Sequence, residues 1–429
     1  MKAIISNRIY LDDPGIEKTK EIAKALTYKI KKDTGNPKFS SVETVKSYKV
    51  LPRGILSIPQ GRQDLIPEGY EIVDKRRLNP VPFPDPKFEL RPSQQPVYDS
   101  VNDTVFINAL VGWGKTFTAL HLAHKFGQKT LVITHTVALR DQWADEVTAL
   151  FGIAPGLIGS GVVDYEDHFI TIANVQTLVK LAPELRKEFG TIILDEAHHC
   201  PATTFATIVE CFEARYRIAL SGTMIRKDGK HVLFRDYFGD NVVRPPQSDT
   251  LTPVVKLVRT GITLKPGAAW VDRITELVND VGYQKFVAAT ALSQMAAGHQ
   301  VLIIADRVDF LKQVKEYIGE DCLLVTGTEG EDRNVAKEKL LSGEKRAIAG
   351  SRQIFSEGIS INSLSCVVLA TPISNDSLLE QIVGRIQRLH SDKLAPLVID
   401  MQFSGYADKK QNNDRLAFYM RKGWSIVTV

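Results

Sequence analysis

The sequence is poor in cysteine and has no long apolar run. Its 429 residues include only four cysteines, at positions 200, 211, 322 and 366, and none forms a CxxC pair. We therefore expect reduced structural thiols, and neither a zinc ribbon nor a disulfide framework. The apolar runs, such as Val301 to Ala305, are the length of a strand, whereas a membrane helix needs about 20 apolar residues. This excludes a transmembrane protein, and the early Arg8, Asp12 and Asp13 exclude a signal peptide, so a cytoplasmic chain is predicted.

Charge of either sign is nearly balanced, but it is unevenly placed. The formal net charge is +4, yet residues 1–80 carry 16 Lys+Arg against 10 Asp+Glu, so the rest of the chain is slightly acidic. A basic N-terminal segment is typical of a domain that binds a polyanion. A lysine-rich surface that serves solubility alone is an equally good interpretation of the charge by itself.

The clearest domain boundary is a proline repeat. Between Asn79 and Pro86 a proline occupies every second position, which forces an extended path unsuited to a helix or a central strand. Before it, short apolar stretches flank a lysine-rich helical pattern from Ile16 to Lys32, so we predict a small basic α+β domain. A second proline-containing stretch, Arg244 to Pro266, separates two further regions. We predict three domains: residues 1–86, including the linker, 87–250 and 251–429.

Both regions after the linker alternate buried strands with amphipathic helices. The predicted strands of the first are 104–107, 130–133, 169–172, 191–194 and 217–220, with helices at 116–125 and 137–150. The predicted strands of the second are 301–305, 322–325, 346–349, 366–370 and 397–399. This alternation predicts two tandem α/β domains, each with a parallel sheet and crossover helices.

The strongest local motif is the segment Ala109 to Thr116, which follows a predicted strand and opens a predicted helix. Gly112 and Gly114 allow backbone N–H groups to turn toward a triphosphate, and the helix N-terminus adds a favourable dipole. Lys115 can reach the β- and γ-phosphates, and the Thr116 hydroxyl can ligate magnesium. The pattern predicts an ATP phosphate loop, with a chance Gly-Lys-Thr turn as the alternative.

Two carboxylates follow another predicted strand. Asp195 and Glu196 come directly after residues 191–194, at the strand end where an open α/β sheet presents its ligand-binding side chains. Asp195 can hold magnesium, while Glu196 can polarise a water for attack on the γ-phosphate. An exposed acidic turn is the alternative. The adjacent His198, His199 and Cys200 cannot converge on one ion without outside ligands, so we do not predict a metal site there.

A pair of arginines stands out in the last region. Arg385 and Arg388 are three residues apart on a predicted amphipathic helix, so both guanidinium groups can point at one anion. If that anion is the γ-phosphate, ATP joins the two α/β domains, and arginines used in this way raise phosphoryl-transfer rates by about 10³–10⁵. A solvated basic helix is the alternative.

Taken in order, these segments resemble a superfamily 2 helicase of the DEAH-box-containing, RecG-like and UvsW-like branch. The resemblance spans Leu90 to Arg388. It includes the following segments: 90–94 (the Gln segment), 109–116 (motif I), 133–136 with Leu139, Gln142 and Trp143 (Ia), 173–178 (Ib), 195–198 (II), 220–226 (III), 301–305 with Arg307 (IV), 355–361 (V) and 381–388 (VI). The layout looks most like that of phage branch-migration helicases.

The resemblance implies two RecA-like domains that bind ATP and Mg²⁺ in a cleft, with nucleic acid across both. The residues implied in nucleotide binding are Arg91, Gln94, Gly112, Trp113, Gly114, Lys115, Thr116, Asp195 and Gly358, with Thr116 and Asp195 on the metal. The implied catalytic residues are Lys115, Glu196, Gln381, Arg385 and Arg388. The implied nucleic-acid contacts are Thr134, His135, Thr136, Arg140, Asn174, Gln176, Arg307 and Ser356.

The predicted function is an ATP-dependent DNA helicase that unwinds or branch-migrates forked and four-way-junction DNA in recombination, replication or repair. We expect a monomer that contacts the phosphate backbone of DNA. Other replication or recombination proteins are expected as further partners. If the chain is phage-encoded, it is expected in the host cytoplasm. A double-strand DNA translocase and an RNA helicase fit the same motifs. A different class is an annealing protein with a degenerate ATP site, for which Trp113 and Gly222 are the motivation.

Overall fold

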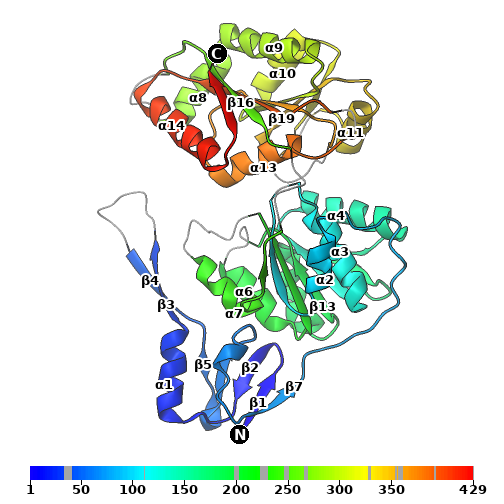
Figure 1. Ribbon diagram of the computed structural model, residues 1–429, viewed down its shortest axis with the longest axis vertical. Helices are drawn as coiled ribbons and strands as arrows, with labels where there is room; N and C mark the ends of the chain where they lie inside the picture. The colour runs from blue at the N-terminus through cyan, green and yellow to red at the C-terminus, as the bar shows by residue number, and fades with distance from the viewer. Residues whose placement is uncertain are drawn as a thin grey trace. The chain divides into compact units, whose positions relative to one another are not determined.

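The protein folds into two compact units, which we describe from a computed structural model. One contains residues 1–110 and 114–246, and the other contains residues 247–429 together with the short segment 111–113 (Figure 1). The structure describes residues 1–32, 41–110, 112–197, 202–222, 230–245, 251–264, 269–326, 330–352, 355, 361–390 and 393–428. The first two predicted domains thus lie together in one unit. Within the described ranges, no helix has both the length and the apolar character to cross a bilayer.

A small α+β module begins the first unit. Its mixed sheet has the order β5-β6-β2-β1-β7. The strands are β1 (Lys2–Ile5), β2 (Arg8–Leu11), β5 (Lys49–Val50), β6 (Leu56–Pro59) and β7 (Glu71–Asp74), and helix α1 is Gly15–Ala25. The module has its own core, made of Ala3, Ile5, Ile9, Leu11, Ile22, Leu26, Leu56 and Ile58. These residues alternate along the strands, because successive side chains of a strand point to opposite faces.

The predicted helix from Ile16 to Lys32 is wrong beyond Ala25. The chain continues as strand β3 (Thr27–Lys32), which pairs antiparallel with β4 (Ser41–Lys46) in a separate two-stranded ribbon. Tyr28 and Ile30 are half-buried and buried, whereas the intervening Lys29 is exposed. This period-two pattern of aromatic and β-branched residues between lysines favours a strand, and packing of one ribbon face overrides the helical propensity of lysine.

The larger part of the first unit is an eight-stranded sheet in the order β11-β10-β12-β9-β13-β14-β8-β15. Its strands are β8 (Val105–Asn108), β9 (Thr130–Thr134), β10 (Gly156–Gly159), β11 (Val162–Val163), β12 (Ile170–Asn174), β13 (Thr191–Leu194), β14 (Tyr216–Ser221) and β15 (Val242–Val243). The helices are α2 (Gln95–Ser100), α3 (Lys115–Phe126), α4 (Val137–Phe151), α5 (Val175–Leu185), α6 (Ala202–Cys211) and α7 (Phe234–Phe238). All pairings are parallel except β10 with the edge strand β11.

Both faces of this sheet are covered, as a parallel sheet requires. Helices α5, α6 and α7 bury Leu178, Val209 and Phe234 against one face, in a core that also contains Leu131 and Ile192 of the strands. Helices α3 and α4 pack on the sheet as well, and Figure 1 shows them on the side opposite α6 and α7. The β-α alternation places the carboxyl ends of the parallel strands at one edge, where the loops that carry the motifs lie.

The second unit contains a seven-stranded parallel sheet in the order β18-β19-β17-β20-β21-β16-β22. Its strands are β16 (Val254–Arg259), β17 (Val301–Ala305), β18 (Cys322–Val325), β19 (Ala347–Ser351), β20 (Cys366–Leu369), β21 (Leu397–Gln402) and β22 (Ser425–Thr428). The helices are α8 (Trp270–Asn279), α9 (Val281–Ala296), α10 (Val308–Ile318), α11 (Arg333–Leu341), α13 (Asp376–Ile386) and α14 (Tyr406–Arg421).

Alternate residues of β17 enter two separate cores. Val301, Ile303 and Ala305 join the core under α8, α9 and α10, whereas Leu302 and Ile304 join the core under α11, α13 and α14. The strand is therefore buried on both faces. The predicted fold class, two tandem RecA-like α/β domains after a small α+β module, is confirmed.

The proline linker is held against the first α/β domain along much of its length. Lys129 N donates to Asn79 O at 2.7 Å, and Val81 N donates to Gly127 O at 3.1 Å. The ring of Phe83 lies against those of Phe151 and Phe169. The linker therefore fixes the path of the chain between the module and the sheet.

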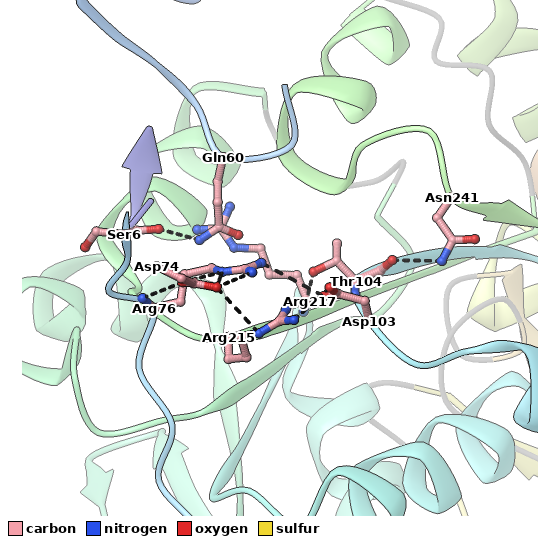
Figure 2. Close-up of polar contacts among 9 residues, drawn as sticks. All are labelled: Ser6, Gln60, Asp74, Arg76, Asp103, Thr104, Arg215, Arg217 and Asn241. Carbon is pink, nitrogen blue, oxygen red and sulfur yellow. Dashed lines mark hydrogen bonds and ion pairs between the residues drawn. The ribbon is translucent and has the colours of Figure 1, made fainter. Parts of the chain in front are cut away.

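The N-terminal module docks at the amino ends of the strands of the first α/β domain. Arg215 precedes β14, and Asp103 precedes β8. The two form a bidentate ion pair, with N–O distances of 2.5 and 2.9 Å. Asp74, the last residue of β7, pairs with Arg76 at 2.6 Å and lies 3.9 Å from Arg215. Figure 2 shows these charges gathered in one cluster with Arg217. The module thus sits at the sheet edge opposite to the motif-bearing loops.

Two features make this docking close. Gly61 N donates to Asp236 O at 2.9 Å, and a Cβ at Gly61 would lie 2.5 Å from Arg235 O, so only glycine fits. The fully buried Arg217 of β14 donates to the carbonyls of Asn7, Val209 and Phe212. Burial lowers the pKa of Arg217 to about 9, because the charged form is taken out of water.

Candidate functional site

The loop between β8 and α3 turns tightly at two glycines. Gly112 and Gly114 have φ of +88° and +95°, the left-handed region that glycine adopts without strain. Gly114 is the N-cap of α3, so Lys115 opens the helix, where backbone N–H groups and the helix dipole attract an anion. Lys115 Nζ donates to Ala109 O at 3.1 Å and lies 3.9 Å from Glu196 Oε1. The lysine thus joins the loop to the acidic pair.

The predicted adenine-reading segment packs on the same loop. Gln94 is buried; its Oε1 accepts from Arg91 N at 3.0 Å and its Nε2 donates to Gly114 O at 3.3 Å. A Cβ at position 114 would lie 2.5 Å from Gln94 Nε2 and 2.7 Å from Arg91 Nη2. The φ of residue 114 therefore requires glycine, and a larger residue there would also displace the ends of the Gln94 and Arg91 side chains. The structure brings Arg91, Gln94 and the phosphate loop together.

The acidic pair follows the buried strand β13 in a strained turn. Glu196 has φ +44°, a backbone conformation that is uncommon for residues other than glycine and that clusters at functional sites. Its N–H donates to Asp195 Oδ1 at 2.9 Å, and the next residue, Ala197, donates to Leu220 O at 3.0 Å. These bonds hold the turn between β13 and β14. His198, His199 and Cys200 lie outside the described residues.

Burial shifts the pKa of the Asp195 carboxyl. It is 5% exposed, and burial, followed by the adjacent Glu196 charge, raises its pKa to about 6 against the effects of Trp143 and Lys115. Mg²⁺ prefers oxygen ligands, and two are available here. They are the Asp195 carboxylate and the hydroxyl of the half-buried Thr116 on the first turn of α3. The residues present therefore fit a magnesium-bound nucleotide, whose cation would offset the buried negative charge.

Backbone hydrogen bonds connect the motifs along the carboxyl edge. Ala109 N donates to Ser221 O, and Asp195 N donates to Ile133 O, both at 3.1 Å. The phosphate loop, the acidic pair and the segments after β9 and β14 are thus one cluster. Of the predicted motif III, residues 223–226 lie outside the described part of the chain.

The predicted nucleic-acid contacts after β9 differ in exposure. Thr134 is fully buried, and its hydroxyl lies 3.3 Å from both Thr136 O and Ala173 O. His135 and Thr136 are half-buried, and Val137 is exposed. The Thr136 side chain caps α4 by accepting from Leu139 N at 3.2 Å. Residues 135–137, and not the side chain of Thr134, are therefore the part of this segment that solvent reaches.

Three other residues predicted to contact nucleic acid form ion pairs or hydrogen bonds within the protein. Arg140 is buried and pairs with Asp141 at 2.7 Å. Asn174 caps α5 by accepting from Gln176 N at 3.1 Å, and Gln176 Nε2 donates to His135 O at 3.1 Å. The segments that begin α4 and α5 are thereby joined, and Gln176 is the exposed member of the three.

The predicted arginine pair of the second unit does not lie on one helix. Gln381 and Arg385 are buried on α13, and Arg385 Nε donates to Phe355 O at 3.0 Å. The helix ends at Ile386, its last buried apolar residue, because no apolar stripe continues beyond it. Arg388 is therefore in the following turn, where its Nη1 lies 3.3 Å from Asn362 Oδ1. The expected i, i+3 helical face is wrong.

The remaining predicted residues of this unit are partly described. Arg307 is the half-buried N-cap of α10, at the carboxyl end of β17. Beside it, Asp306 pairs with Arg352 at 2.7 Å, and Arg352 donates to Thr371 Oγ1 at 2.8 Å. Ser356 and Gly358 lie outside the described residues, so their predicted roles stay predictions.

Sequence reasoning missed one polar partner of the acidic pair. Trp143, in the segment that resembles a nucleic-acid-binding motif, is fully buried and its Nε1 donates to Asp195 Oδ2 at 2.7 Å. Nothing in the spacing of the two residues, 52 positions apart, signals this contact. A buried tryptophan must find an acceptor for its N–H, and only the fold identifies that acceptor.

Comparisons with known proteins agree with this geometry. Residues 87–226 match the family model "Type III restriction enzyme, res subunit", and residues 284–390 match "Helicase conserved C-terminal domain". The chain is 39% identical to "Probable helicase D10" of Escherichia phage T5, over 100% of this chain and 96% of that protein. It is 28% identical to "Putative ATP-dependent RNA helicase L396" of Acanthamoeba polyphaga mimivirus (98% and 85% covered). It is 24% identical to "ATP-dependent DNA helicase uvsW" of Enterobacteria phage T4 (73% and 68% covered).

The fold, the site and these relatives lead to one family. The motifs on the carboxyl edge of the first sheet fall within the first family match, and Arg385 and Arg388 fall within the second. The chain belongs to the superfamily 2 helicases and is an ATP-hydrolysing helicase.

Proposed function

We propose that this helicase couples ATP hydrolysis to movement on DNA and to the unwinding or branch migration of forked and four-way-junction DNA. The observation that carries the proposal is the cluster of Lys115, Asp195 and Glu196 at the carboxyl edge of the first sheet, with Lys115 Nζ 3.9 Å from Glu196 Oε1. The T4 relative named as a DNA helicase supports DNA as the substrate. We expect a monomer that contacts the DNA backbone.

In this proposal the residues of the carboxyl edge divide the chemistry among them. Lys115 and the N–H groups of the phosphate loop bind the β- and γ-phosphates, and Thr116 and Asp195 hold Mg²⁺, which supplies charge neutralisation on the phosphates. Glu196 accepts the proton of the attacking water. Arg91 and Gln94 bind the adenine. Arg385 and Arg388, with Gln381, stabilise the charge that develops on the transferred phosphoryl group.

Nucleic acid is gripped through its phosphates, by groups such as residues 135–137, Gln176 and Arg307. Contacts of this kind are independent of sequence and weaken as salt is added. ATP hydrolysis changes these contacts one after another, and the protein therefore moves along a strand. Sequence-independent grip leaves the choice of DNA structure to another part of the chain, and we assign it to the N-terminal module.

The β3–β4 ribbon is the part of that module best suited to a duplex arm. Its register puts Lys29, Thr44 and Lys46 on one face, and all three are exposed. The other face is committed to the protein, since Tyr28 donates to Asp236 at 2.7 Å and Lys230 pairs with Glu43 at 2.9 Å. A basic face on a two-stranded ribbon is suited to the phosphates that border a DNA groove.

The test compares nucleic acids and two matched variants. The wild-type protein is assayed for ATP turnover and strand displacement with single strands, forks, four-way junctions and displacement loops, each made as DNA and as RNA. Lys29→Glu with Lys46→Glu should weaken binding to forks and junctions at least about 10-fold, with little effect on single strands, because roughly 1 kcal/mol is lost per phosphate contact. Lys409→Glu with Lys410→Glu, two exposed lysines of α14, is the control.

Each outcome selects one function. Stronger activation by RNA than by DNA would make the chain an RNA helicase, which the name of the mimivirus relative favours. ATP turnover on duplex DNA without strand displacement would identify a double-strand translocase. Absence of turnover with every nucleic acid would contradict the proposed coupling and leave a binding or annealing protein with a degenerate ATP site. Equal loss on forks and single strands would contradict the role of the ribbon.

A further inference from the structure

Trp143 lies on α4 and makes a buried hydrogen bond to the acidic pair. Its side chain is fully buried, and its Nε1–H donates to Asp195 Oδ2 at 2.7 Å. An indole nitrogen is a donor only, so it cannot exchange roles with a neighbouring donor. A hydrogen bond from a buried donor to a carboxylate is short and roughly twice as strong as a neutral one.

The contact completes a pair of restraints on one carboxylate. Asp195 Oδ1 accepts from Glu196 N at 2.9 Å, and Oδ2 accepts from Trp143. One N–H on each oxygen determines the plane of the group, and each oxygen keeps further lone-pair capacity for a cation. The main chain is restrained as well, because Asp195 N donates to Ile133 O at 3.1 Å. Among the described residues, the indole is the hydrogen-bond donor that reaches this side chain from outside its own turn.

We propose that Trp143 is a positioning residue, which holds the Asp195 carboxylate in the orientation that binds magnesium. This inference rests on Asp195 as the magnesium ligand of the proposed function. A partner that orients a metal ligand typically contributes about 10- to 100-fold to metal affinity. Trp143 touches neither the nucleotide nor the reacting water in this role, so its effect passes through Asp195.

The decisive variant is Trp143→Phe, which keeps an aromatic ring and removes the donor. Mn²⁺ binding to the protein–ADP complex, measured by electron paramagnetic resonance, should weaken by about 10- to 100-fold. The Mg²⁺ concentration that gives half-maximal ATP turnover should rise by a similar factor, with a smaller change in the rate at saturating Mg²⁺. Phe151→Leu, which changes a buried aromatic at the C-terminal end of α4, is the control for lost packing and should leave metal affinity unchanged.

Asp195→Asn separates this inference from the proposed function. If Asp195→Asn does not weaken Mn²⁺ binding, the magnesium assignment of Asp195 is wrong. If Asp195→Asn weakens binding but Trp143→Phe binds Mn²⁺ as the wild type does, Trp143 has no positioning role. Weakening in Phe151→Leu equal to that in Trp143→Phe would also overturn the inference, since the cause would then be packing of α4.

A second measurement does not depend on Trp143→Phe folding. The chain has four tryptophans, so ¹⁵N-indole labelling gives four Nε1–H resonances. Asp195→Asn should shift one of them more than the other three, because it removes the charge that the Trp143 N–H faces. Addition of Mg²⁺ and ADP to the wild type should shift the same resonance. Four resonances that respond equally, or not at all, would contradict the contact.

Discussion

Both edges of the sheet in the first α/β domain carry charged residues, but the partners of these residues differ. At the carboxyl edge, Lys115 follows the positive-φ residue Gly114, Glu196 has a positive φ itself, and the two side chains lie 3.9 Å apart beside Asp195. At the amino edge, Arg8, Glu210 and Arg217 are tied into the docking of the N-terminal module. Charged side chains of this sheet therefore attach the N-terminal module at one edge, whereas those at the other edge are the ones that we propose bind the nucleotide.

The positive charge of the N-terminal module has two separate uses. Arg8 pairs with Glu210, and Arg62 with Asp64 and Asp236, so part of the positive charge of residues 1–80 is used inside the protein. The exposed lysines of the β3–β4 ribbon are a separate group. Net charge alone does not separate these two uses, because it contains no information on burial.

The largest effect is expected at the carboxyl edge. Glu196→Gln should lower ATP turnover by about 10²–10⁴-fold, because the amide cannot accept a proton from the attacking water. Its thermal unfolding midpoint should stay near that of the wild type. Glu210→Gln at the amino edge is the matched control and should leave turnover per folded molecule unchanged. Normal turnover in Glu196→Gln would remove Glu196 from the mechanism.

The next effect is on stability and belongs to the amino edge. Gly61→Ala places a Cβ about 2.5 Å from Arg235 O, so backbone must shift. The free energy of unfolding in urea should fall by about 1–3 kcal/mol, the usual cost of overpacking. ATP turnover per folded molecule should not change, because the phosphate loop lies at the other edge of the sheet.

Gly69→Ala measures the contribution of backbone conformation without a clash. Gly69 has φ +81° and no atom within 4 Å of a built Cβ, so its substitution should cost less than that of Gly61. If both substitutions destabilise the protein equally, the docking of the module is looser than the structure describes.

The smallest effect distinguishes buried from exposed charge. A double-mutant cycle of Arg8→Met and Glu210→Gln should give a coupling free energy of about 1–3 kcal/mol, because Arg8 is only 4% exposed. The same cycle on Lys18 and Glu21, an exposed pair on α1, should give almost none, since water screens it. Similar coupling in the two cycles would show that the Arg8–Glu210 pair does not hold the module in place.

Much of the fold was predictable because the apolar runs of a parallel sheet are continuous. The strands 191–194, 301–305 and 322–325 were predicted to the residue. The helix predicted across Thr27–Lys32 failed because lysine favours helices, whereas packing of Tyr28 and Ile30 decided for a strand. Arg388 was predicted on a helix, but it lies beyond the end of α13 because the apolar stripe ends at Ile386.

The sequence by itself determined the order of strands and helices, the phosphate loop and the acidic pair. Those features depend on local spacing, such as glycines before a helix and carboxylates after a strand. Only the tertiary structure decided that Trp143 binds Asp195, and that Arg217 and Gly61 attach the N-terminal module. Such contacts join residues far apart in the chain, and a buried N–H or guanidinium receives its partner from packing, which leaves no local pattern.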